Sequence, residues 1–185
     1  MSKAVLISIR PEWCKKILAG VKTIEVRKTR PKIETPFKCY IYQTRKPVQV
    51  SFSGTGRHIS EYDKTCWYNE RSGKVIGEFV CDEIVDISIS CSDPDMKGIP
   101  FPYTALTDRQ IMDYLGNGKT GYGWHISDLK IYDKPKDISD FMRPCLKKED
   151  DFPLCLDCER LVKHFGCGGT ILRPPQSWCY VEEIQ

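Results

Sequence analysis

Residues 23–27 alternate between polar and apolar side chains, directly after a segment of helical pattern that ends at Gly20. Successive strand residues point to opposite faces, so Ile24 and Val26 would share one face of a strand. The polar members would share the other face, beside Lys22 at the strand entrance: Thr23, Glu25 and Arg27. This motif, residues 20–27, predicts a helix, a glycine stop and a strand in that order. Its polar face is either an exposed surface with cross-strand charge pairs or the lining of a site.

The size and composition of the chain favour one globular domain, residues 1–185. The chain has 185 residues, 41% of them apolar and 29% charged, which suits a packed core and argues against disorder. Its net charge of +3 permits contact with nucleic acid without arguing for it. The apolar runs are too short for a membrane span or for a signal peptide, so we expect a cytoplasmic protein.

Strand signals recur along the chain between turn-forming residues. They predict strands at these positions: 4–9, 23 to about 28, 38–43, 74–87, 122–132 and 177–184. Helix signals predict three further elements: helices over 11–19 and 107–115, and a helical turn over 137–141. The polar stretch 51–73 is interpreted as a loop insertion. The set predicts an α+β domain, either compact or built as a small β-barrel of five or six strands flanked by short helices.

The motif and its surroundings resemble the ASCH domain, a branch of the PUA-like superfamily. Residues 10–12 (RPE) and 17–27 (ILAGVKTIEVR) carry the resemblance, because G-x-K-T-x-E-x-R is the hallmark of that family. Residues 123–126 and 174–181 look like strands of its bacterial and phage members. The resemblance implies a small β-barrel with a cleft into which the polar residues of the motif point.

The same resemblance implies two functions. ASCH domains are thought to bind RNA or nucleotides, which would make RNA or a nucleotide-like small molecule the partner of this chain. Some small members hydrolyse an acylated nucleoside with a lysine, a threonine and a later glutamate. Lys22 matches that lysine, Glu78 is a candidate for the glutamate, and Glu25 stands where those hydrolases keep their threonine. A carboxylate does not replace a hydroxyl nucleophile in amide hydrolysis, so binding is favoured over an amidohydrolase that uses Lys22, Glu25 and Glu78. A module that recognises a protein or modified DNA is a third possibility.

Several side chains are candidates for ligand contact in such a cleft: Lys22, Thr23, Glu25, Arg27, Trp124, Gln176 and Ser177. Lysine and arginine suit phosphates, and a tryptophan can stack on an unpaired base. Each candidate also has a structural alternative. Lys22 and Glu25, or Glu25 and Arg27, would then be a buried ion pair at the mouth of the barrel, and Trp124 a core residue.

Four of the ten cysteines are crowded into a C-terminal insertion, residues 145–167. Their spacing is C-x9-C-x2-C-x8-C, from Cys145 through Cys155 and Cys158 to Cys167. In a chain without an export signal, this spacing favours a tetrahedral structural zinc site over disulfides. The alternatives are His164 as the fourth ligand, or free thiols on a loop.

Overall fold

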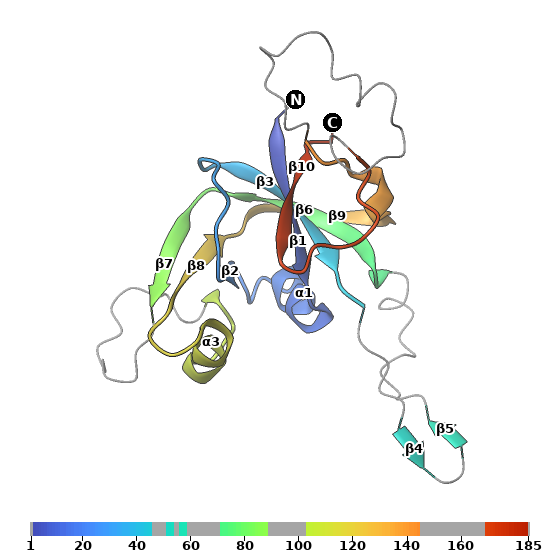
Figure 1. The fold of residues 1–185 in the computed structure, drawn as a ribbon, viewed down its shortest axis with the longest axis horizontal. Coiled ribbons are helices and arrows are strands. Elements are labelled where there is room, and N and C mark those ends of the chain that lie inside the picture. Colours follow the sequence, from blue (N-terminus) through green and yellow to red (C-terminus); the bar gives the residue numbers. More distant parts are fainter. Residues whose placement is uncertain are drawn as a thin grey trace.

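The computed structural model of the chain describes residues 2–45, 51–53, 56–58, 71–88, 103–144 and 169–184. A five-stranded sheet runs in the order β10 (Trp178–Glu182), β1 (Lys3–Ile9), β3 (Phe37–Gln43), β6 (Lys74–Cys81), β9 (Ser127–Lys136). A three-stranded sheet runs in the order β2 (Ile24–Arg27), β8 (Thr120–His125), β7 (Ile84–Ser88). The described helices are α1 (Pro11–Leu18), α3 (Asp108–Leu115) and the 3-10 turn η3 (Ile138–Asp140). Figure 1 shows the smaller sheet and α3 to one side of the larger sheet.

The first strand lies inside the larger sheet, next to the edge strand β10, and is buried on both faces. β1 pairs in parallel with β3 and antiparallel with β10, and every residue from Ala4 to Ile9 is buried. A nearly continuous apolar run is typical of such a strand. Val5 and Ile7 pack in a core with α1 and with Trp124 of β8, which joins the two sheets. On the opposite face, Leu6 packs in a second cluster around Tyr40 and Phe141.

The predicted strands 74–87 and 122–132 are wrong as single elements, because each divides between the two sheets. β6 gives way to β7 at Asp82 and Glu83, and β8 gives way to β9 at Ile126. The two breaks lie close together, since His125 Nδ1 is 2.7 Å from Asp82 Oδ1. The expected closed barrel is also not found: in the described part of the chain, β6, β7, β8 and β9 belong to two open sheets of five and three strands within an α+β fold.

Both predicted helices are confirmed, and local signals explain their bounds. Pro11 occupies the first turn of α1, and the chain leaves the helix at Gly20, whose φ of +69° favours glycine. The Thr107 hydroxyl accepts from the Gln110 N–H, and the Gln110 side chain accepts from the Thr107 N–H, which is a capping box for α3. The buried side of α3 covers the smaller sheet through Ile111, which packs with Val26 and Ile87.

Of the two expected insertions, the structure describes parts of residues 51–73 and none of residues 145–167. Within 51–73, β4 (Ser51–Ser53) and β5 (Gly56–His58) pair as an antiparallel two-stranded sheet. The cysteine-rich insertion, residues 145–167, lies outside the described residues.

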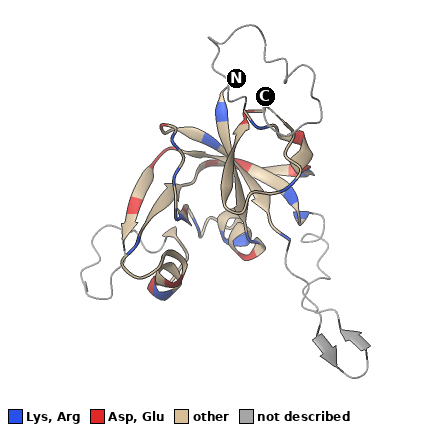
Figure 2. Ribbon diagram, viewed as in Figure 1, with Lys and Arg blue, Asp and Glu red and all other residues tan. Residues whose placement is uncertain are grey.

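Charges of both signs are distributed over the described helices and strands (Figure 2). None of the described helices is long and apolar enough to cross a membrane.

Candidate functional site

The predicted alternation of the motif is confirmed in β2. Val26 is buried beneath α3, whereas Glu25 and Arg27 point to the opposite face. Glu25 is directly opposite Trp124 in the register of β2 and β8, so its carboxylate lies on the side of the main core. The polar face of the motif is therefore turned into the protein.

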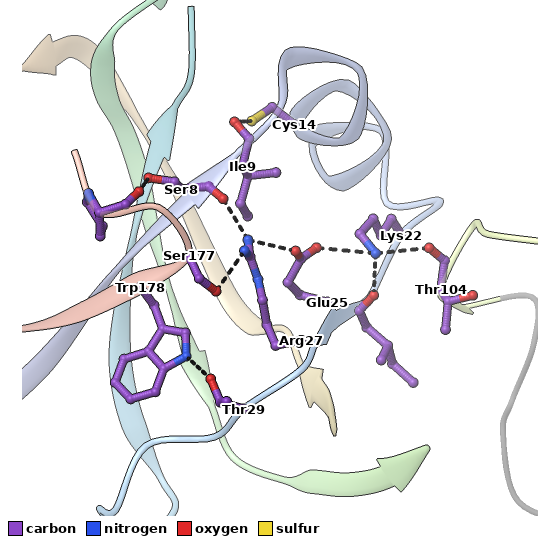
Figure 3. A network of polar contacts seen from close by, with 12 residues as sticks. Ser8, Ile9, Cys14, Lys22, Glu25, Arg27, Thr29, Thr104, Ser177 and Trp178 are labelled. Atoms are coloured by element: carbon purple, nitrogen blue, oxygen red, sulfur yellow. Dashed lines mark hydrogen bonds and ion pairs between the residues drawn. The ribbon is translucent and has the colours of Figure 1, made fainter. Parts of the chain in front are cut away.

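Glu25 lies between the two cations of the motif (Figure 3). Its Oε2 is 3.2 Å from Lys22 Nζ, and its Oε1 is 2.9 Å from Arg27 Nη2. Lys22 is 2% exposed, and Glu25 and Arg27 are each 7% exposed. Buried charges need partners, and here each charge of the motif has one. The motif thus forms both of the buried ion pairs that the structural alternative named, and the Glu25 carboxylate is shared between Lys22 and Arg27.

Lys22 connects the motif to the segment 103–106, which leads into α3. Its Nζ donates to the carbonyl oxygens of Ile24 (2.6 Å) and Thr104 (3.0 Å), in addition to the ion pair with Glu25. The same segment is held at Ala105, whose carbonyl accepts from Lys16 Nζ at 3.1 Å. An ammonium has three donors, so these three acceptors match the full donor capacity of Lys22.

Arg27 connects the motif to β1 and to the loop 174–177. Nη2 donates to the Ser8 carbonyl oxygen at 2.6 Å, and Nη1 donates to Ser177 Oγ at 3.3 Å. Ser8 holds the same loop, because its hydroxyl donates to the Pro175 carbonyl oxygen at 2.6 Å. Lys22 and Arg27 therefore fix two segments that lie on opposite sides of Glu25.

Both segments contribute walls to a cavity of about 1150 Å³, the main cavity, the first through Leu106 and the second through residues 174–177. Five predicted site residues line it together: Lys22, Glu25, Arg27, Gln176 and Ser177. The floor also includes Ser8 and Ile9 at the carboxyl end of β1. Cys14 packs behind this floor, where burial raises the pKa of its thiol, so the thiol is neutral.

Three predicted site residues lie elsewhere. Thr23 lines a second, smaller cavity of about 210 Å³ together with Tyr103 and His125. Trp124 is fully buried in the core, with its ring centre 5.9 Å from that of Phe37, and it lines neither cavity. The structure therefore corrects the idea of Trp124 as a stacking surface, because no part of the ring is exposed.

Glu78 is also separate from the motif, so the structure does not assemble the expected set of Lys22, Glu25 and Glu78. Its carboxylate accepts a hydrogen bond from the Tyr132 hydroxyl and lies 4.0 Å from Lys38 Nζ, and it lines neither cavity. Burial, with this hydrogen bond as a second cause, raises the pKa of Tyr132.

The four cysteines expected to bind zinc, Cys145, Cys155, Cys158 and Cys167, lie outside the described residues. Among the residues that are described, no three metal-ligating side chains come together. The zinc site therefore stays a prediction.

The sequence interpretation missed cationic and aromatic residues that line the main cavity. Arg10 and Arg45 follow β1 and β3, and Trp13 and Tyr114 come from α1 and α3. A signal for the arginines was present, since each follows an apolar strand closely. It becomes informative only when the two strands are known to be parallel neighbours, whose carboxyl ends share one edge of the sheet.

Comparison with known proteins relates this fold to one group of solved structures. No protein-family model and no curated protein matches the chain. The ASCH protein of Zymomonas mobilis matches at 20% identity with a TM-score of 0.52, over 97% of this chain and 88% of that one. Tyrosine-to-phenylalanine and serine-to-alanine mutants of that protein match with the same identity and TM-score, over 98% and 97% of this chain and 92% and 89% of theirs. The chain accordingly has an ASCH-like fold.

Proposed function

We propose that this chain, with its ASCH-like fold, binds single-stranded RNA or a nucleotide-like ligand in the main cavity. The observation that carries the proposal is the charge of the cavity lining. Five cationic and three anionic side chains line it: Arg10, Lys22, Arg27, Arg45 and Lys74, against Glu25, Asp113 and Asp137. An excess of cations around a cavity attracts phosphate groups.

The aromatic lining and the size of the cavity support the same ligand class. Trp13 and Tyr114 line the cavity, and Tyr114 is 39% exposed, which leaves ring surface on which a base can stack. Pockets for small molecules have volumes of about 300–1000 Å³. The main cavity, at about 1150 Å³, is larger, which favours a ligand longer than one nucleotide.

The alternative, hydrolysis of an acylated nucleoside, is not favoured by the contacts of the motif. A general base must accept a proton from the substrate or from water, but Lys22 donates to three protein oxygens. Each carboxylate oxygen of Glu25 is paired with a cation, and Glu78 lies outside the cavity. We therefore propose binding rather than catalysis.

Fluorescence anisotropy with a labelled single-stranded RNA about ten nucleotides long tests the proposal, with the salt concentration raised in steps. We expect binding that weakens with salt, with a log–log slope of about −0.7 for each phosphate contact. Lys134→Ala is the control, because Lys134 is exposed on β9 outside the cavity. A wild-type protein that fails to bind at low salt, or binds without salt dependence, would refute the proposal.

A further inference from the structure

The cations of the motif have little capacity left for a ligand. The three donors of Lys22 are matched by three protein oxygens, and its side chain is 2% exposed. Arg27 uses Nη2 for Ser8 and Glu25 and Nη1 for Ser177. Its Nε has no hydrogen-bond partner among the described residues, but this atom is itself inaccessible to solvent. A phosphate in the cavity would thus meet little of either charge.

The same contacts hold the two walls in place. Lys22 and Lys16 both donate to the segment 103–106, in which Ala105 has a φ of +56°. A non-glycine residue in this left-handed region is strained and persists where surrounding contacts fix it. On the other side, Arg27 donates to Ser177 in the loop 174–177. Glu25 joins both cations, so one buried carboxylate connects the two walls.

Two exposed cations, Arg10 and Arg45, lie at the rim of the cavity. Ile9 of β1 and Gln43 of β3 are paired in parallel register, so Arg10 and Arg45 follow the carboxyl ends of neighbouring strands. Both arginines are exposed and line the main cavity. Within the part of the chain that the structure describes, no carboxylate lies within 4.0 Å of either guanidinium. Lys74, by contrast, is paired with Asp137.

The position of Arg45 depends on a glycine. Gly73 has a φ of +78°, and a Cβ added there would lie 2.6 Å from Arg45 Nε and 3.2 Å from its Cγ. Only a residue without a side chain leaves the guanidinium this place against the backbone. The chain therefore provides room for Arg45 at the rim.

We propose that Arg10 and Arg45 bind the phosphate groups of the ligand at the rim, while Lys22 and Arg27 are positioning residues that fix the cavity walls through Glu25. A guanidinium offers phosphate a planar fork of donors, which suits both rim arginines. The identity of the ligand rests on the proposed function. The separate roles of the rim arginines and of the motif cations rest on the contacts that each of them makes.

The salt dependence of RNA binding separates contact residues from positioning residues. Each of Arg10→Ala and Arg45→Ala should weaken binding at low salt and make the log–log slope shallower by about 0.7, because one phosphate contact is lost. Lys22→Met should weaken binding but leave the slope unchanged, and hydrogen exchange at residues 103–107 should become faster. Unchanged slopes in both rim variants, or a shallower slope in Lys22→Met, would overturn the inference.

Two further measurements keep the inference testable. If Lys22→Met does not fold, Ser177→Ala replaces it, since this variant removes only the hydroxyl acceptor of Arg27. We then expect an unchanged slope and faster exchange at residues 174–177; a shallower slope or unchanged exchange would contradict the positioning role.

If wild-type protein binds no RNA, the proposed function fails, and titration with inorganic tripolyphosphate decides the rim site separately. Binding that falls about tenfold in each rim variant, a loss of about 1.4 kcal/mol, supports the site, since each variant loses the charge-assisted hydrogen bonds of one guanidinium to phosphate. No binding to wild-type protein, or equal binding to the variants, overturns it.

Discussion

Glu25→Gln is the most informative test of how the motif stabilises the protein. The substitution keeps the size and shape of the side chain but removes the charge that lies 3.2 Å from Lys22 and 2.9 Å from Arg27. Both cations remain buried, because they are 2% and 7% exposed. Breaking a buried ion pair by removing one partner costs about 3–5 kcal/mol, and we expect a loss of free energy of unfolding in that range.

Urea unfolding followed by tryptophan fluorescence measures this loss. In a separate thermal unfolding experiment, we expect the melting temperature of a chain of this length to fall by about 2–4 °C for each kcal/mol lost. The matched control is Asp113→Asn, since Asp113 pairs with Arg109 at 4.0 Å between side chains that are 75% and 91% exposed. Such a surface pair contributes no more than about 0.5 kcal/mol.

A double-mutant cycle checks the physical cause. Lys22→Met removes one of the cations that Glu25→Gln leaves without its carboxylate, so the double variant should be less destabilised than the sum of the single variants, by about 1 kcal/mol or more. Two results would contradict this reasoning: a loss in Glu25→Gln as small as that in the surface control, or strict additivity in the cycle.

Three further predictions concern packing, titration and metal. Gly77→Ala should destabilise the larger sheet by about 1–3 kcal/mol, because its Cβ would lie 2.5 Å from the Lys130 carbonyl oxygen; Lys134→Ala, at an exposed position of β9, is the comparison in thermal unfolding. Burial raises the pKa of Cys14 and Cys39 and raises that of Cys81 to about 12, so the folded state retains protons that the unfolded chain releases above the ordinary thiol pKa of 9.0. Unfolding free energy, measured with urea, should therefore fall from pH 9 upward by as much as about 1.4 kcal/mol per pH unit for each thiol, and a flat profile would contradict this. Metal analysis of protein purified without added zinc should give one zinc per chain, lost in Cys155→Ser, whereas a ratio well below one would count against the site.

Local signals in the sequence predicted most of the elements and the orientation of the motif. The glycine stop, the capping box and the alternation of Ile24 and Glu25 act over a few residues, so they can be interpreted without knowledge of the rest of the fold. Long-range features could not be predicted in this way. The breaks at Ile126 and at Asp82 lie inside runs of continuous β character, and only pairing with other strands assigns each half to its sheet.

Alternation and residue type are insufficient in two places, for reasons of the same kind. Simple alternation along β6 would place Val75 on one face with Phe79, but β6 shifts register against β3 between Ile41 and Tyr42, and Val75 lies in the opposite cluster. Trp124 and Glu78 were plausible site residues by type. Their actual positions depend on how the sheets pack against each other, which residue type and spacing do not reveal.

The place of β1 between β10 and β3 has a consequence for synthesis. β1 is synthesised before both of these neighbours, and its pairing with β10, as between Lys3 and Glu182, joins segments about 180 residues apart in the sequence. One edge of an apolar strand therefore stays unpaired for about ten seconds or more of translation, at roughly 5–20 residues per second. An open apolar edge is a template for pairing with other chains. We expect a chain truncated before β10 to aggregate, because one edge of β1 then stays unpaired.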